Sequence, residues 1–275
     1  MGRLGQMIQW LLVFFSVAAA SLAHAEAQDR FVTSAGLAYS TLYVTDGFRV
    51  GDSSDVFQMT LKLDIPKSDF SVMYWNSLRV DRSKDRFDEH DFFILYSTAF
   101  NQESVYGFKF NAYYDYWDFP NNRKQRDPFG DEITNGKFHG SKLNAGLAFN
   151  NLLPILGSYL VPAYNVFYWI YWAQDRSDMF QGGARHELSL TFTRDLPEFS
   201  PSYQSPYVGL FTSVNYNDGA FNVKPGMSHT LVSAYTGFKA LGLQNSLSAN
   251  QQFSHQRTVN PRNDFWIAVS TIKEF

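Results

Sequence analysis

The chain contains no cysteine among its 275 residues, so it has no disulfide framework, no thiol nucleophile and no cysteine-ligated metal. It also lacks an excess of basic residues, because 23 Lys and Arg stand against 26 Asp and Glu. A nucleic-acid-binding domain is normally basic with clustered Lys and Arg, so nucleic acid is excluded as a partner. Beyond residue 25 no apolar run approaches the ~20 residues that a membrane-spanning helix needs, which excludes a helical membrane protein.

The first 25 residues have the composition of a secretory signal peptide. Arg3 supplies a positive start, residues 11–20 form an apolar segment, and Ala23-His24-Ala25 matches a small-x-small cleavage site. A membrane-spanning helix is the alternative, but the apolar run is too short to cross a bilayer. We therefore expect residues 1–25 to be a signal peptide and residues 26–275 to form one exported domain.

Alternation of apolar and polar residues is the main structural signal. From Val56 to Ile65 every second residue is apolar and the residues between are mostly polar, which is the period of a strand with two different faces. The polar turn 66–69 and a second alternating run over 70–80 then predict a β-hairpin. Aromatic residues form 17% of the chain and fill many of the apolar positions. Aromatic girdles are typical of membrane barrels, so the pattern favours a transmembrane barrel over a soluble β-sandwich.

The connections sort into two lengths, as they do in outer-membrane barrels. Six long polar segments alternate with five shorter links, which predicts an all-β, antiparallel, up-and-down transmembrane β-barrel of about twelve strands with periplasmic termini; ten or fourteen strands are the alternatives. The apolar face is least clear in the tenth and eleventh strands. The predicted strands are 31–45, 56–65, 70–80, 91–100, 105–117, 141–150, 159–173, 184–195, 207–216, 229–239, 245–253 and 264–275.

The last residues resemble the assembly signal of outer-membrane proteins. Phe265, Ile267 and Val269 alternate along the final strand, and Phe275 occupies the terminal position. Lys273 departs from the pattern, which usually has an aromatic or apolar residue there. The resemblance implies recognition by the barrel-assembly machinery and residence in the cell outer membrane, among lipid and lipopolysaccharide.

The opening of the mature chain resembles TorF-type porins. Residues 36–40 and 43–50, with the strand that begins at Val56, match a first strand, an aromatic–Arg loop and a Gln-containing second strand. The resemblance implies passive passage of small polar solutes and brings no catalytic motif or cofactor. Nucleoside-specific and acidic-oligosaccharide channels are of similar size, so the solute is left undetermined.

The strand phase also predicts which side chains line the interior. Cations and anions are both present, so it does not assign ion selectivity, and an open channel and a packed, plugged barrel are both compatible with it. Inward aromatic residues form either a stacking track for flat solutes or a packed plug. The main pore-lining candidates are Lys62, Asp64, Arg79, Lys109, Asp115, Lys142 and Glu187, and the inward aromatics are Trp75, Tyr113, Trp117, Phe167, Trp169 and Tyr171.

An outer-membrane lipid hydrolase, of phospholipase or lipid A deacylase type, is the alternative class. It needs a Ser–His pair oriented by a third polar group, or a His–carboxylate pair with a metal. His139-Gly140-Ser141 is the only suggestive cluster, but neighbours in a strand point to opposite faces, and His139 and Ser141 are too far apart for a direct hydrogen bond. The chain is therefore predicted to be no enzyme, and the remaining alternative is a non-conducting structural barrel.

Acidic groups gather in two predicted loops, where they either bind divalent cations that bridge lipopolysaccharide or remain as solvated charge. Their spacing matches no calcium-binding loop, so no metal site is predicted. The groups are Asp81, Asp85, Asp88, Glu89 and Asp91 in one loop and Asp127, Asp131 and Glu132 in the other.

Overall fold

The fold was analysed in a computed structural model of the chain. It describes residues 31–49, 55–80, 88–120, 124–126, 132–134, 138–174, 180–198, 200, 203–220 and 223–275. The predicted signal peptide lies outside the described residues, as do Asp81, Asp85, Asp127 and Asp131 of the two acidic loops.

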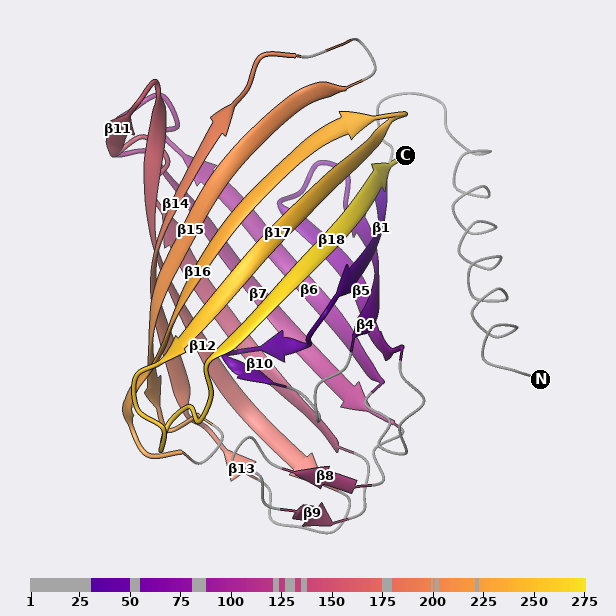
Figure 1. Cartoon of the computed structure of the whole chain (residues 1–275), viewed down its shortest axis with the longest axis vertical. Helices are drawn as coiled ribbons and strands as arrows, with labels where there is room; N and C mark the ends of the chain where they lie inside the picture. Colours follow the sequence, from indigo (N-terminus) through magenta and orange to yellow (C-terminus); the bar gives the residue numbers. More distant parts are fainter. Residues whose placement is uncertain are drawn as a thin grey trace, which may run out of the picture.

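Twelve long strands form a closed antiparallel barrel, which confirms the predicted fold class and strand number (Figure 1). Each strand pairs with the next one along the chain, and β1 pairs with β18 to close the sheet. The tenth and eleventh strands, the least distinct in the sequence, are both present. The strands are β1 (Val32–Ser40), β4 (Val56–Asp64), β5 (Phe70–Arg79), β6 (Glu89–Phe100), β7 (Phe108–Phe119), β10 (Phe138–Ala148), β12 (Ser158–Gln174), β14 (Ala184–Asp195), β15 (Gln204–Asp218), β16 (Gly226–Ala240), β17 (Leu243–Ser254) and β18 (Asp264–Glu274).

Short strands of two or three residues lie at the two ends of the barrel. β2 (Val44–Thr45) pairs with β3 (Phe48–Arg49), and β8 (Lys124–Arg126) pairs with β9 (Glu132–Thr134). β11 (Leu153–Ile155) and β13 (Phe180–Gln181) each pair with β12. We call the end with the shorter connections the turn end and the opposite end the loop end. β1 begins and β18 finishes at the turn end, where the Phe275 amide donates a hydrogen bond to the Thr33 carbonyl at 2.8 Å.

The connection between β16 and β17, at the turn end, has the backbone geometry of a tight turn. β16 and β17 are joined by Leu241 and Gly242 alone, with φ angles of 53° and 74°. Positive φ at both central residues is the geometry of a type I′ turn, whose twist matches that of the strands it joins. The hairpin register is therefore set locally, and it places the inner faces of β16 and β17 in phase.

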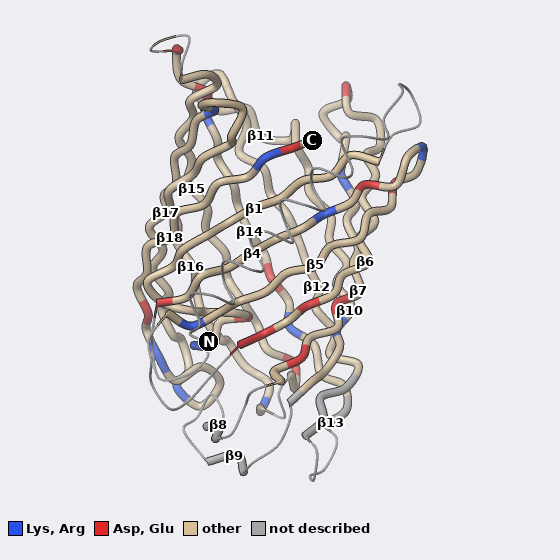
Figure 2. Tube along the Cα trace, turned by 90° about the vertical axis from the view of Figure 1, so that its right-hand side faces the viewer, with Lys and Arg blue, Asp and Glu red and all other residues tan. Residues whose placement is uncertain are grey.

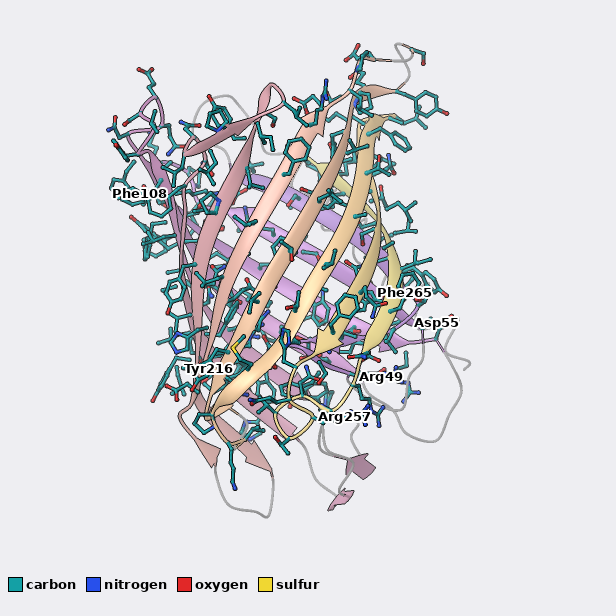
Figure 3. All side chains as sticks on the ribbon, turned by 60° about the vertical axis from the view of Figure 1, so that its left-hand side comes forward. Arg49, Asp55, Phe108, Tyr216, Arg257 and Phe265 are labelled. Atoms are coloured by element: carbon teal, nitrogen blue, oxygen red, sulfur yellow. The ribbon has the colours of Figure 1, made fainter. Side chains whose placement is uncertain are left out.

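The barrel's exposed and buried faces are the reverse of those of a water-soluble protein. Leu188, Leu210 and Phe265 are 65%, 56% and 58% exposed on the outside of the strands, and the buried residues are mostly polar. Figure 3 labels Phe108, Tyr216 and Phe265 on this outer side of the ribbon. An apolar outer band is stable in lipid and unfavourable in water. Among the residues that the structure describes, no helix is long and apolar enough to cross a bilayer.

Two local departures from the predicted strands affect the interior. The first strand was predicted to run to residue 45, but β1 ends at Ser40, whose hydroxyl donates to the Leu42 carbonyl at 2.7 Å and supports a turn. A β-bulge between Ser141 and Lys142 shifts the pairing of β10 with β12. Such a bulge changes which residues share a face, so the alternation predicted for β12 cannot be extended past it. The side chain of Tyr171, which was predicted to face inward, lies outside the described ones.

The face of a strand on which a residue lies predicts how much a charge placed there lowers the free energy of unfolding. Leu61 lies in the middle of β4, opposite Ala35 and Tyr74, and Thr60 lies on the other face, opposite Gly36 and Trp75. Leu61→Arg places a cation against lipid and should cost ~2–4 kcal/mol of unfolding free energy, while Thr60→Arg should cost less. Urea titration of both variants in lipid vesicles measures the difference; equal costs, or the reverse order, would contradict this strand phase.

Candidate functional site

A short hairpin crosses the interior of the barrel at its loop end. After Ser40 the chain leaves the wall, and β2 and β3 fold across the barrel (Figure 1). The Asp46-Gly47 turn between them has φ angles of 50° and 85°, which Asp-Gly turns favour. Tyr43, which precedes β2, and Phe48, the first residue of β3, are both buried. We call residues 42–49 the lumenal hairpin.

Asp46 joins the tip of the lumenal hairpin to the wall opposite β1. Its carboxylate accepts hydrogen bonds from Lys142 Nζ of β10 at 2.9 Å and from Arg185 Nη2 of β14 at 3.0 Å. These strands flank β12, which is six strands from β1 in either direction around the barrel. The hairpin therefore spans the width of the lumen.

The surroundings of Asp46 favour its charged form. Burial alone would raise the pKa of this carboxyl, but the charges of Lys142 and Arg185 outweigh burial, and the pKa lies below its ordinary value of 3.8. Burial also raises the pKa of Tyr43 well above its ordinary value, and the charge of Glu89 adds to that effect. At neutral pH the hairpin is thus held by one anion and one neutral phenol.

Gly47 fastens the hairpin to a third part of the wall. Its carbonyl accepts hydrogen bonds from Gln252 Nε2 of β17 at 2.8 Å and from Asn260 Nδ2 at 2.6 Å, and both amides are buried. A Cβ added at Gly47 would overlap the imidazole of His229 on β16. Only glycine therefore fits both the backbone angle and the space at this position.

The base of the hairpin is held by polar side chains as well. Tyr43 donates a hydrogen bond to Glu89 of β6, and its ring lies 5.8 Å from that of Trp75 on β5. Arg49 forms an ion pair with Asp264 at the start of β18. The contacts of the hairpin thus reach β5, β6, β10, β14, β16, β17 and β18.

The predicted pore-lining residues divide between the two ends. At the turn end Lys62 and Asp64 form an ion pair of 2.6 Å with side chains 35% and 41% exposed, and Lys109 is exposed. At the loop end the side chains of Lys142 and Asp115, 3.4 Å apart, are only 10% and 1% exposed. Figure 2 shows charged residues mainly toward the two ends of the strands. The charged side chains at the turn end are thus partly exposed, and those at the loop end are buried around the hairpin.

The other two candidates lie in the loop half. Glu187 of β14 lies 3.7 Å from Arg185, and Asn165 donates a hydrogen bond to it at 3.2 Å. Arg79 is the last residue of β5. The structure thus gathers Asp115, Lys142 and Glu187 around the hairpin, whereas a solute-lining role for these residues is still a prediction.

Part of one predicted acidic loop belongs to the wall instead. β6 begins at Glu89, earlier than expected, so Glu89 and Asp91 are buried strand residues rather than solvated loop charges, which corrects the predicted boundary. The reason is the pairing of Glu89 with Ser77 and Asp91 with Trp75, which extends the hairpin. Within the described ranges, no group of three or more His, Asp or Glu side chains is placed to hold a metal ion.

Part of the predicted set of inward aromatic residues packs together in the loop half. Trp117, Phe119 and Trp169 form a buried cluster with Ala220 of the β15–β16 connection, and Phe167 packs against it. The guanidinium of Arg185 lies 4.0 Å from the ring centroid of Phe167, and Lys142 Nζ lies 5.8 Å from that of Trp169. These rings support the two cations that hold Asp46.

Four histidines lie where strands meet the long loops, beside hydroxyl or aromatic neighbours. Three of them contact tyrosine or threonine hydroxyls, and His90 Nδ1 also lies 3.1 Å from the Asn76 amide; these contacts do not form a hydrolytic triad. Tyr74 bonds His90 at 2.7 Å, Tyr164 bonds His186 at 2.6 Å, Thr230 bonds His255 at 2.7 Å, and the ring of Tyr116 lies 6.3 Å from that of His139.

The fifth histidine corrects one sequence argument. Neighbouring strand residues were expected to be unable to form a hydroxyl–imidazole pair, yet Ser228 Oγ lies 2.9 Å from His229 Nδ1. A register shift opposite Tyr216 leaves Ser228 unpaired in the ladder and turns it toward His229. Both residues are buried, with His229 against Gly47, so this pair has no opening to lipid or solute.

No family model matches the chain, and no curated protein matches it in sequence. The fold is that of an outer-membrane β-barrel.

Several solved outer-membrane barrels have a similar overall shape. They include the translocator domain of the autotransporter NalP from Neisseria meningitidis (12% identity, 99% of this chain and 98% of that one, TM-score 0.49). A second is the β domain of the Bordetella autotransporter BrkA (10% identity, 89% of this chain and 98% of that one, TM-score 0.47). A third is LpxR from Salmonella typhimurium (9% identity, 88% of this chain and 100% of that one, TM-score 0.47). These likenesses say nothing of activity.

Sequence reasoning missed the residues that hold the hairpin. Asp46 was assigned to an external loop, and Arg185, Gln252 and Asn260 were given no role. One signal was present, because Asp-Gly between β-forming residues is a strong hairpin signature, and it predicts a two-residue turn at 46–47. The direction in which that hairpin points depends on partners 96 and 139 residues away in sequence.

Because a Cβ at Gly47 would overlap His229, Gly47→Ala should weaken the contacts that hold the hairpin to the wall. The added methyl combines a strained positive φ with overlap on His229, so hydrogen exchange of the amides of residues 44–49 should increase. Gly242→Ala is the matched control, because its φ is 74° but nothing lies within 4 Å of the added Cβ. If both variants exchanged residues 44–49 as slowly as the parent protein, the described fit would be wrong.

The charge of Asp46 predicts that acid releases the hairpin. Its folded pKa is below 3.8, so its contribution to the hairpin is complete above that pH and is lost as pH falls through the folded pKa. NMR signals of residues 44–49 in detergent micelles should shift and broaden below pH ~3.8 while those of the barrel strands remain. Signals unchanged down to pH 2 would show that the carboxylate is not what holds the tip.

Proposed function

We propose that the protein is an outer-membrane channel for the passive passage of small polar solutes, closed at rest by the lumenal hairpin. The observation that supports the proposal is the contrast between partly exposed charged side chains at the turn end and buried ones around the hairpin at the loop end. The porin class is also the one that the segment from Gly36 to Val50 resembles.

Residence in the outer membrane is supported by the apolar outer face and the polar interior. A closed barrel is the one sheet architecture that leaves no unpaired edge in lipid. The predicted signal peptide, and recognition of Phe275 by the barrel-assembly machinery, belong to the same proposal, with lipid and lipopolysaccharide as the surroundings.

Reversible closure is supported by the kind of contact that holds the hairpin. Asp46, Gly47 and Arg49 are held by ion pairs and hydrogen bonds, which water or a solute can replace. The hairpin also buries Leu42, Tyr43 and Phe48, so its release exposes apolar surface as well. A solute that enters from the exposed turn end would meet the hairpin before it could leave through the loop end.

The hydrolase alternative has less support. The inner Ser228–His229 pair is buried against the hairpin, and His90, His186 and His255 contact tyrosine or threonine hydroxyls, with Asn76 also beside His90. A structural barrel without conductance is a clearer competitor, since it needs the same fold and the same hairpin. Conductance separates it from a channel.

The proposal predicts that Asp46→Asn opens the channel. Losing hydrogen bonds to a charged group removes ~1.5–3 kcal/mol from the closed state, so the open-to-closed ratio should rise about tenfold or more. Single-channel recording in planar bilayers measures this ratio. Glu103→Gln, which removes an exposed carboxylate from a short connection at the turn end, should leave it unchanged.

Heat-modifiable migration on a gel shows that each variant has folded before it is recorded. A folded Asp46→Asn protein without discrete current steps would contradict the channel and favour the structural barrel. Release of fatty acid from phospholipid vesicles by the purified protein would favour the hydrolase instead.

A further inference from the structure

The two cations that hold Asp46 form a binding site for one carboxylate. Lys142 Nζ contacts Oδ2 at 2.9 Å and Arg185 Nη2 contacts Oδ1 at 3.0 Å, so each oxygen has its own donor. The donors come from different strands, and the carboxylate comes from a third segment that is continuous with neither. The acid is therefore the only member of the trio that is not fixed to the wall at this place.

The wall holds this cation pair in position without the help of Asp46. Arg185 also donates to Asn215 Oδ1 at 2.7 Å and lies over the ring of Phe167. Lys142 lies over Trp169 and within 3.4 Å of Asp115. Phe167 and Trp169 are alternate residues of β12, so both cations rest on one strand. A site built in this way persists when its occupant leaves, which favours binding.

A free carboxylate that replaced Asp46 would leave the charge at this site unchanged. Asp115 lies beside Lys142, and Glu187 lies 3.7 Å from Arg185, so two cations already face two fixed anions. Asp46 adds one negative charge. Exchange of Asp46 for a free carboxylate conserves the local charge and the number of charge-assisted hydrogen bonds, whereas a neutral solute restores neither.

We propose that small carboxylate solutes compete with Asp46 for Lys142 and Arg185 and thereby release the lumenal hairpin. This inference rests on the proposed channel function for its biological meaning and names both the solute class and its control of the channel. In this scheme Asp46 is a tethered stand-in for the solute. The displaced carboxylate leaves the site as the solute carboxylate enters, and no covalent bond changes.

Cysteine labelling tests the competition without relying on conductance. The chain has no cysteine, so Thr45→Cys provides a single thiol beside Asp46 in the hairpin. Its reaction rate with a polar maleimide is measured in detergent with sodium acetate, or with acetamide and sodium chloride at the same ionic strength. Acetamide has the shape of acetate without its charge. Ser68→Cys, exposed in the β4–β5 turn, is the control position.

Acetate should accelerate labelling at Thr45→Cys by at least about fivefold over acetamide, the lower end of typical coupling between two equilibria. Ser68→Cys should react equally in both solutions. Adding Asp46→Asn to Thr45→Cys should give fast labelling with either solute, because the tethered competitor is gone.

Equal rates in acetate and acetamide at Thr45→Cys would overturn the competition, even in a protein that conducts. An equal acceleration at Ser68→Cys would also overturn it, because the effect would then not be local to the hairpin. Acetate-dependent labelling in a protein that never conducts would support the competition and refute only the channel.

Discussion

The pairing of β1 with β18 is the constraint on which the rest of the molecule depends. In lipid an unpaired backbone amide or carbonyl costs several kcal/mol, so a sheet is stable there only when it closes. Seven residue pairs from Ser34–Glu274 to Ser40–Ala268 make that closure. Once the sheet is closed, period-two alternation leaves apolar side chains outside and polar ones inside.

The closed sheet leaves polar side chains inside the barrel, and the lumenal hairpin supplies partners for some of them. Polar side chains packed inside must find partners, and several charged groups in the loop half lie too deep for water to serve them. The tip of the hairpin supplies a carboxylate to Lys142 and Arg185, and its backbone supplies an acceptor to Gln252. Closure of the lumen and satisfaction of its polar groups are therefore achieved by the same residues.

The barrel strands could be predicted from the sequence, but the contacts inside the barrel could not. Strands such as 56–64 and 264–274 carry their pattern locally, and the lengths of the connections fixed their order, so twelve strands could be predicted. Contacts of Asp46 with Lys142 and Arg185 join residues 96 and 139 positions apart, which no local pattern encodes. The bulges at Ile170, opposite Ser141 and Lys142, and at Ser228 each insert one residue into a ladder.

The hairpin also acts mechanically, as a strut. A cylinder made of one sheet flattens easily, because bending between neighbouring strands changes few contacts. An element anchored on β10 and β14 at one side and continuous with β1 at the other fixes the diameter along that line. Release of Asp46 thus does more than clear the lumen, since it frees the cross-section of the loop end to become elliptical under the lateral pressure of the bilayer.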